Sequence, residues 1–379
     1  MKLHRMPLVV QRMIIEEFGF DERLFLSFTS KQSCSLLGLF RNDLKGVSIE
    51  IDIKTSKVSI RVRKLSYRST ELISAIDILS TISNELKFDI PYEQYSVYGS
   101  SACRIAGSTV LYKKYPSTIR CALIDERVER DTTRNAVIAF GKVLKHLNSF
   151  LNIQECRQCE FEMTLPVGLF RQLDCSYSYG SIETRTGHIA STTPEDLTFL
   201  LDNIKAEQLS LNVEVPSDPG YKYQNNPEKK SYIDLLKILN YSWVDFSDLP
   251  AARVISMEIQ SCEVNEVLKS WVAGRNLELE IGEFEIDRLT ELNRETIFNG
   301  ITRHETQLTE AEITSFFDSS EHLPNRQYLR SIVAVDILRK SDGVRATVIE
   351  GRNIFKPIRN VFVMVWSESN LNTIGRANA

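Results

Sequence analysis

The stretch ARVISMEIQSCEVNEVLKSW, residues 252–271, changes its hydrophobic period half-way along. The first half has the β-branched and apolar residues of a buried strand. The second half spaces its apolar residues three and four apart, as an amphipathic helix does. The strand-like run NLELEIGEFEI follows at 276–286, and residues 194–215, PEDLTFLLDNIKAEQLSLNVEV, pair a helix with a strand in the reverse order. Such alternation predicts an α/β domain with a mixed sheet.

The spacing of this region also suggests a repeat. Leu279 lies 22 residues after Met257, and Leu211 lies 46 residues before it, or two such steps. That period lies within the range of leucine-rich repeats. A Pro/Asn/Lys-rich insertion at 216–231 interrupts the pattern, and a plain α/β layer with coincidental spacing remains the alternative. The residues that fit the repeat template L-x-x-L-x-L-x-x-C-x-L are Val254, Met257, Ile259, Cys262 and Val264.

Polar strand positions of this region are candidates for binding a protein partner. If the repeat interpretation holds, they line the concave face that solenoid proteins use for binding. The candidate residues are Ser210, Asn212, Ser256, Glu258, Glu278 and Glu280.

The N-terminal forty residues predict three short helices that are too apolar to stand alone. Residues 8–18 carry apolar side chains around most of a helical circumference, which is typical of a helix buried on more than one side. Further helices are expected at 21–28 and from Ser30, a good N-cap. About 35 residues cannot bury this surface among themselves. Either the rest of the chain or a partner protein must cover it.

The remainder of the chain predicts strands and helices joined by short turns. Alternating apolar residues indicate a half-buried hairpin at the start of a second domain, and a Ser-Asp-Gly turn indicates another hairpin near the end. The expected elements are a hairpin at 46–64, a helix at 69–86, a strand at 118–128, a helix at 135–151, a strand at 158–165, a hairpin at 336–351, a strand at 362–366 and a frayed polar tail at 367–379.

Composition places the chain among globular proteins and excludes several functional classes. The 379 residues are 42% hydrophobic and carry a net charge of −4, so no basic field indicates nucleic-acid binding. Seven cysteines follow a start that lacks the features of a secretory signal. No apolar stretch approaches the length of a membrane span. We therefore expect an intracellular protein of the cytoplasm or nucleus with reduced thiols.

No catalytic constellation is evident, and no cofactor is expected. The sequence has no P-loop, no G-x-G-x-x-G after a strand, no H-E-x-x-H and no G-x-S-x-G. Cys156 and Cys159 form a lone C-x-x-C pair, which Cys175 and His188 could complete as a metal site. Buried small hydrophobic thiols are the simpler interpretation, with no bound metal. The paired carboxylates Glu283 and Glu285 are expected to face solvent.

The N-terminal helices resemble the F-box. The resemblance rests on Met6-Pro7, Ile14, Phe18, the run from Leu24 to Phe28, and Ser30-Lys31, which match without a gap. It implies a three-helix unit that docks onto the adaptor subunit of a cullin-based SCF ubiquitin ligase. The residues that it implies for the docking surface are Pro7, Leu8, Val10, Ile14, Phe18, Leu24, Phe25 and Phe28.

The second half resembles the type 2 F-box-associated domain found in a large nematode family of F-box proteins. The resemblance rests on residues 242–285, on Asn299-Gly300-Ile301 and on residues 336–351. The expected fold class is α+β, with a three-helix F-box at 1–44, a first part of the recognition domain at 45–190, a leucine-rich-repeat-like F-box-associated domain at 191–366 and a polar tail at 367–379.

The resemblance implies a non-enzymatic substrate receptor that binds the adaptor through the F-box and a protein substrate through the C-terminal domain. Two alternatives stay open. One is an interaction protein whose N-terminal helices fold against its own domain and bind no ligase. The other is an enzyme that uses Cys156 and Cys159 with a metal, which predicts stoichiometric zinc in the purified protein.

Overall fold

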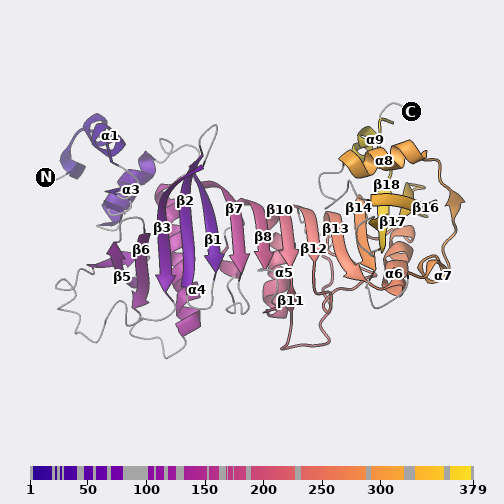
Figure 1. Ribbon diagram of the computed structural model, residues 1–379. Coiled ribbons are helices and arrows are strands. Elements are labelled where there is room, and N and C mark those ends of the chain that lie inside the picture. The colour runs from indigo at the N-terminus through magenta and orange to yellow at the C-terminus, as the bar shows by residue number, and fades with distance from the viewer. Residues whose placement is uncertain are drawn as a thin grey trace. The chain divides into compact units, whose positions relative to one another are not determined.

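The computed structural model shows a mixed α+β protein, as predicted, whose chain divides into two compact units (Figure 1). Unit 1 comprises Met1–Thr192 and unit 2 comprises Thr193–Ala379. Among the residues described, no helix combines the length and apolar character needed to cross a bilayer. The structure describes residues 3–18, 22–23, 26–27, 30–40, 47–53, 57–65, 70–79, 101–105, 108–114, 118–124, 132–151, 153–161, 168, 170–173, 175–184, 189–226, 232–286, 292–319, 329–353 and 359–376.

Unit 1 is a mixed sheet with strand order β8-β7-β1-β2-β3-β6-β5-β4. Strands β8, β7 and β1 are parallel, and the predicted hairpin of β1 and β2 is confirmed by antiparallel pairing of Ile51 with Ile60. The strands are β1 (Val47–Ile53), β2 (Lys57–Leu65), β3 (Thr70–Leu79), β4 (Ser101–Ile105), β5 (Ser108–Lys114), β6 (Thr118–Ile124), β7 (Ile153–Phe161) and β8 (Ser178–Thr184), with β9 (Ala190–Ser191) after them.

Helix α4 (Thr132–Phe150) is the main helix of unit 1 and confirms the helix predicted at 135–151. It packs against β2, β3, β4 and β6 and lies behind these strands in Figure 1. Its buried residues are Phe140, Val143, Leu144, Leu147 and Phe150. The other helices of the unit are η1 (Leu3–Arg5), α1 (Leu8–Glu16), α3 (Lys31–Leu39) and η4 (Phe170–Gln172).

The helix predicted at 69–86 is wrong, because residues 70–79 form strand β3. This strand pairs antiparallel with β2, so that Ile76 lies opposite Ile60 and Ile78 opposite Val58. Its other neighbour is β6, which lies parallel to it. Leu72, Ile76 and Ile78 keep a period of two that suits this position, so strand pairing overrides the local helical pattern. Residues 80–86 of the predicted helix lie outside the described residues.

Unit 2 joins a parallel group of strands to an antiparallel one, in the order β10-β12-β13-β14-β18-β17-β16-β15. The first four are parallel and the rest antiparallel, which confirms the C-terminal hairpin and its third strand. The strands are β10 (Lys205–Leu211), β11 (Val213–Glu214), β12 (Tyr232–Ile238), β13 (Ala252–Ile259), β14 (Ile281–Ile286), β15 (His304–Glu305), β16 (Leu329–Leu338), β17 (Arg345–Asn353) and β18 (Arg359–Val365).

The parallel strands place part of the expected repeat in register. Leu211 lies opposite Ile238, and Ile238 opposite Met257, so Leu211 and Met257 occupy equivalent positions two strands apart. The next step differs from the expectation, because Phe284 rather than Leu279 lies opposite Met257. Leu279 precedes β14 in a turn that follows α6. The residues between the end of α6 and the start of β14 therefore make the step from Met257 to its equivalent on β14, Phe284, longer than the predicted 22 residues.

Helices cover both faces of the sheet of unit 2, but not to the same extent. Helices α5 (Pro194–Asn203) and α6 (Ser261–Val272) lie behind the strands in Figure 1. Helix α8 (Glu310–Ser319) lies across the top of unit 2 in Figure 1 and packs its Phe316 and Phe317 in one core with Val254, Ile281 and Phe362. We call the face of the sheet that carries Val254, Ile281 and Phe362 the near face. Two short helices, α7 (Arg294–Ile297) and α9 (Glu368–Thr373), complete the unit.

The polar tail predicted to fray is instead folded as far as residue 376. Ser367 caps α9 by accepting a hydrogen bond from the amide of Asn370. The Asn370 side chain is 3% exposed and donates to the carbonyls of Val365 (2.8 Å) and Glu280 (3.1 Å). Ile374 joins the core beneath α8. The prediction failed because these partners lie outside the tail itself.

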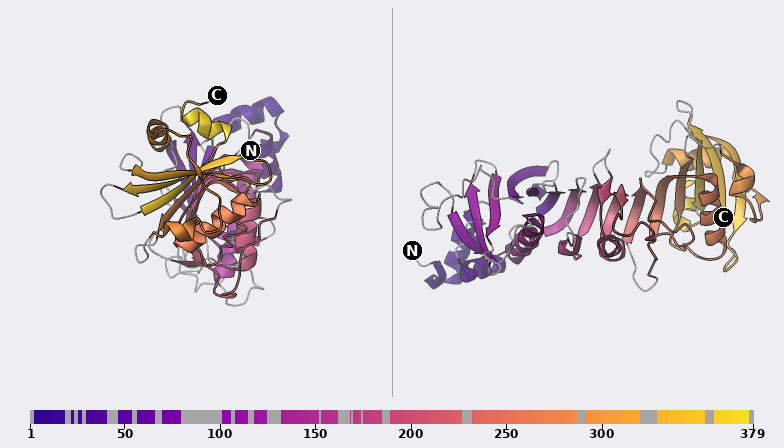
Figure 2. Two further views of the ribbon diagram at one scale, coloured as in Figure 1. Left: turned by 90° about the vertical axis from the view of Figure 1, so that its right-hand side faces the viewer. Right: turned by 90° about the horizontal axis from the view of Figure 1, so that it is seen from below.

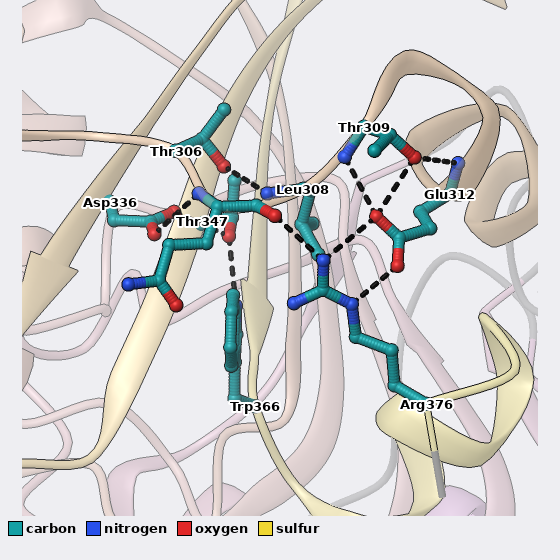
Figure 3. Close-up of polar contacts among 9 residues, drawn as sticks. Thr306, Leu308, Thr309, Glu312, Asp336, Thr347, Trp366 and Arg376 are labelled. Carbon is teal, nitrogen blue, oxygen red and sulfur yellow. Dashed lines mark hydrogen bonds and ion pairs between the residues drawn. The ribbon is translucent and has the colours of Figure 1, made fainter. Parts of the chain in front are cut away.

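Arg376 anchors the end of this segment to the loop before α8 (Figure 3). Its guanidinium pairs with both oxygens of Glu312 and donates to the carbonyl of Gln307 at 2.7 Å. The ring of Trp366 lies under the Arg376 guanidinium, and its indole N–H donates to Thr347, which in turn donates to the buried Asp336. Residues of four segments are thus joined in one network.

Replacing Asn370 by Ala should lower the free energy of unfolding of unit 2 by about 2 kcal/mol, because two buried carbonyls lose their donor. All three tryptophans lie in unit 2, so tryptophan fluorescence during guanidinium denaturation reports on this unit. Asn372→Ala, at an exposed position of the same helix, is the matched control and should change stability little. Equal effects of the two variants would contradict the anchoring role.

Candidate functional site

Helix α1 exposes large apolar side chains. Leu8 is 58% exposed, Val9 70%, Val10 39% and Met13 62%. Only one side of the helix is buried, where Ile15 is 1% exposed and Gln11 donates to the carbonyl of Met6. The helix expected to be buried on several sides therefore carries an unpartnered apolar surface within the residues described. A surface of this kind is typical of a protein interface.

Polar contacts from a neighbouring segment hold the end of α1. Arg23 is 6% exposed, and its guanidinium donates to the carbonyls of Phe18 (3.0 Å) and Glu16 (3.5 Å). These are carbonyls at the C-terminal end of the helix, which lack partners within the helix. A cation at this end also opposes the negative pole of the helix dipole. The helix is thus fixed from its polar end while its apolar side chains stay exposed.

Helix α3 attaches the N-terminal segment to α4. Ser30 caps α3 by accepting from the amide of Ser33 at 3.0 Å, as the sequence predicted. Cys34 lies 3.0 Å from the hydroxyl of Ser149 on α4. Gly38 lets the two helices approach closely, since a Cβ there would lie 2.9 Å from the Ser149 carbonyl oxygen.

His146 adds a titratable group to this contact. Its Nε2 lies 2.8 Å from the Ser27 hydroxyl, and its ring packs edge-on against Phe150 at 5.6 Å. Burial lowers the pKa of His146 from 6.5 to about 4. The contact between Ser27 and α4 is therefore built on a neutral imidazole.

The expected adaptor residues fall into three groups. Pro7, Leu8 and Val10 are exposed, and Ile14 and Phe18 are partly buried. Leu24, Phe25 and Phe28 lie outside the described residues. Sequence analysis missed the exposed side chains of Val9, Met13 and Leu39, the last of which is 69% exposed on α3. Helical periodicity alone could not find them, because it does not say which side of an apolar helix faces the protein.

A second candidate surface is the near face of the parallel strands in unit 2. Strand register places Ser210, Lys237, Ser256 and Glu283 side by side across β10, β12, β13 and β14. The next row toward the C-terminal ends of the strands contains Glu258 opposite Glu285, with Asn360 of β18 opposite Glu285. Alternation puts both rows on one face.

Glu283 is buried on this face, which corrects the prediction that it faces solvent. It is 6% exposed and accepts hydrogen bonds from Ser256 (3.1 Å) and from the amide of Asn360 (3.3 Å). Burial raises the pKa of Glu283 to about 7, with Glu285 adding to the rise and Ser256, Lys237 and Asn360 opposing it. Strand β18 covers this carboxylate, and its Asn360 lies 77 residues after Glu283 in the chain. The sequence around Glu283 therefore gives no sign that the side chain is buried.

The structure brings together only part of the expected substrate-binding set. Ser256 and Glu258 share the near face with Ser210, which is buried at 8% exposure rather than exposed. Glu280 precedes β14 and accepts from Arg253, which also donates to Asp234. Glu280, Arg253 and Asp234 alternate with the near-face positions, so they lie on the other side of the strands. The two remaining residues are Asn212, after β10, and Glu278, which is exposed before β14.

The cysteines of β7 are core residues. Cys156 and Cys159 are both fully buried, and burial raises the pKa of each thiol well above its usual range. A thiol held protonated is a poor nucleophile and a poor metal ligand. In the described part of the chain, no group of three or more His, Cys, Asp or Glu side chains is placed to hold a metal ion. Cys175 is exposed, and His188 lies outside the described residues.

Comparisons with models of protein families, with curated proteins and with solved structures found no match to this chain.

The contact between Ser27 and His146 of α4 should weaken as the pH falls from 6.5 toward 4. The unfolded chain binds more protons at His146 than the folded protein in this range, so stability rises with pH by up to about 1.4 kcal/mol per unit. Hydrogen–deuterium exchange of α4, on which His146 lies, measures this once it is corrected for intrinsic rates. His146→Gln should remove that dependence, and an unchanged slope in the variant would contradict the assignment.

The pH dependence of stability that Glu283 causes has the opposite sign to that caused by His146. Its pKa is raised, so the folded protein binds more protons than the unfolded chain, and stability is lost as the pH rises from 4.5 through 7. Glu283→Gln should stabilise unit 2 at pH 8 by roughly 2 kcal/mol and have little effect at pH 4. Tryptophan fluorescence during denaturation tests this, with the exposed Glu295→Gln as the control. An E283Q effect that does not grow with pH would argue against a buried, titrating carboxyl.

Proposed function

We propose that the protein is a substrate receptor of an SCF-type ubiquitin ligase and has no chemistry of its own. The observation that carries the proposal is the apolar surface of α1, where Leu8, Val9 and Met13 are each more than half exposed. The resemblance of residues 6–31 to the F-box favours the adaptor subunit of the ligase as the protein that would cover this surface. The receptor would act by proximity, holding substrate lysines near a ubiquitin-loaded enzyme bound elsewhere in the complex.

Energetics favour a partner on this surface. Burying a leucine, valine or methionine side chain contributes about 1.5 to 3 kcal/mol. Four such residues on one short helix could together contribute several kcal/mol, and micromolar binding requires about 8 kcal/mol in all. The anchoring of α3 to α4 adds to this, because a helix already fixed in place loses less conformational entropy on binding.

Unit 2 supports the second half of the proposal. Its parallel strands β10, β12, β13 and β14 place Leu211, Ile238 and Met257 in register, as stacked repeats would. Helix-backed parallel strands with an open opposite face are the arrangement that leucine-rich-repeat proteins use to bind other proteins. We assign substrate recognition to this leucine-rich-repeat-like, F-box-associated region.

The principal alternative is a protein–protein interaction protein with a degenerate F-box that binds no ligase. The contacts of Ser27 and Cys34 with α4 favour this alternative, because they show the N-terminal helices folded on the protein's own unit 1. The two hypotheses differ in one observable property. The alternative predicts a stable monomer with no affinity for the adaptor.

Replacing Leu8 and Val10 together by Asp should weaken adaptor binding by more than about a hundredfold, because two carboxylates would be buried without partners. Binding is measured by calorimetry with the purified adaptor subunit. Leu277→Asp, which places the same charge at a 60% exposed leucine of unit 2, is the matched control and should bind as wild type does.

Both variants must retain the far-ultraviolet circular dichroism of the wild type. A wild-type protein that shows no affinity for the adaptor overturns the ligase proposal and supports the alternative. Wild-type affinity retained in the Leu8/Val10 variant would place the adaptor elsewhere on the protein.

A further inference from the structure

Strand β16 forms the outer edge of the sheet of unit 2 over most of its length. Strand β17 pairs with it from Leu329 to Leu338, whereas β15, a strand of two residues, pairs with Val335 and Asp336. In the part of the chain that the structure describes, no strand lies against residues 329–334 on the outer side. An open edge presents unpaired N–H and C=O groups, to which another chain can add as a further strand.

This open edge lacks two features by which proteins keep edge strands unpaired. Residues 331–335, Ser-Ile-Val-Ala-Val, include no charged residue and no proline. The pairing with β17 shifts register between Ser331 and Val333 and is regular from Val333 onward. Val333 and Ala334 are half-buried, so part of each side chain stays open to a neighbouring strand.

A small cavity lies beside this edge, on the face of the sheet opposite the near face. Strand register aligns Val333, Glu350 and Val361 across β16, β17 and β18 on that face. Helix α7 and the residue that follows it, Phe298, form the opposite wall. Because Val333 lies on the edge strand, the cavity extends to the edge itself. The apolar residues that line the cavity are Leu292, Ile297, Phe298, Val333, Val348 and Val361.

The size of the cavity decides what kind of group it accepts. Its volume is about 20 Å³, and a single water molecule needs about 10 to 15 Å³. Sites for small molecules measure roughly 300 Å³ or more, so the cavity is too small for a free ligand. It has room for one or two methyl groups, such as those of a valine side chain. Side chains of an added strand alternate between the two faces of the sheet, so one of them would reach this cavity.

Arg303 supplies a positive charge beside the cavity. It is exposed, and its guanidinium carbon lies 5.3 Å from the centroid of the Phe298 ring, which forms part of the cavity wall. Arg294, the other arginine here, is already paired with the buried Glu350. Among the described residues, no carboxylate forms an ion pair with Arg303. Its guanidinium group therefore complements a carboxylate on an incoming segment.

We infer that the outer edge of β16 binds an extended segment of a partner protein, which adds to the sheet as a strand. The segment places a side chain of the size of valine in the cavity and a carboxylate beside Arg303. In this mode of recognition, main-chain hydrogen bonds give affinity and side-chain pockets give specificity. A second copy of this chain would bring an identical edge with its own Arg303 and its own unfilled cavity, so it complements neither feature. The inference goes beyond the proposed function and holds whether or not α1 binds the adaptor.

The test uses the full-length protein and the fluorescein-labelled heptapeptide Ser-Glu-Ser-Val-Ser-Glu-Ser, with binding measured by anisotropy. Its valine and both glutamates lie on one face of an extended chain, so a carboxylate flanks the valine in either strand direction. Replacing the valine of the peptide by aspartate should weaken binding by about tenfold or more, because a charge would enter an apolar cavity.

Methylation of the peptide main chain tests strand addition directly. In a strand, alternate residues direct their N–H groups to opposite sides. Of two peptides N-methylated at the even or at the odd positions, one should lose binding by about tenfold or more and the other should bind nearly as the parent does. These changes leave the protein itself untouched, so misfolding cannot explain the result.

Two protein variants place the peptide on this edge. Val333→Asp should abolish measurable binding, and Arg303→Gln should weaken it severalfold. The matched controls are Leu277→Asp and Arg275→Gln, which make the same charge changes at other exposed positions of unit 2 and should bind as wild type does. All four variants must retain the circular dichroism of the wild type.

Three results would overturn the inference. They are a wild type that does not bind the heptapeptide, equal binding of the two N-methylated peptides, and wild-type affinity in a folded Val333→Asp variant. Sedimentation should also show a monomer, and a dimer that Val333→Asp dissociates would assign the edge to a second copy instead.

The outcome is independent of adaptor binding. The Leu8→Asp/Val10→Asp variant should bind the heptapeptide as the wild type does. A wild type that binds the heptapeptide but no adaptor would reject the ligase proposal alone.

Discussion

The contact between α3 and α4 is the interaction on which the N-terminal surface depends. Gly38 allows the helices to approach, and Cys34 and Ser27 reach Ser149 and His146 on α4. This contact matters because three helices of this length do not form a stable core of their own. Because the N-terminal segment is attached to α4 through one side, the apolar side chains of α1 on its other side stay exposed to solvent.

A related constraint shapes unit 2. Parallel strands need crossover connections, and helix α6 (Ser261–Val272) forms the one between β13 and β14 (Figure 2). Among the residues that the structure describes, α8 and the tail segment cover the near face where they pack on Ile281, Phe362 and Met364. The strands beyond α8 place polar residues at near-face positions, and this distribution divides the same sheet face into a core and a candidate binding surface.

Local signals in the sequence were sufficient to predict those helices and strands whose contacts are close in the chain. Both hairpins, the cap at Ser30 and helix α4 follow from short patterns, and the structure confirms them. Strand β3 was mistaken for a helix because its apolar residues fit both periods, and one of the two strands that fix its place in the sheet, β6, lies more than 40 residues away. The folded tail escaped prediction for the same reason, since Asn370 bonds to a carbonyl 90 residues earlier. The prediction of a mixed α+β fold remained correct despite these errors, because the fold class depends on most of the helices and strands and not on any single one.

The buried polar cluster of Ser256, Glu283 and Asn360, where β14 lies between β13 and β18, has a structural consequence. Here the parallel strands meet the antiparallel ones, and both neighbours of β14 contribute a hydrogen bond to Glu283. An apolar residue at 283 could pack in several registers of β14 against β18. A buried carboxyl satisfied by Ser256 and Asn360 is satisfied in one register only, because a one-residue slip would move it to the opposite face. We therefore expect the cluster to favour a single pairing of β14 with β18 at some cost in stability, a use of buried polar groups that is well attested in coiled coils.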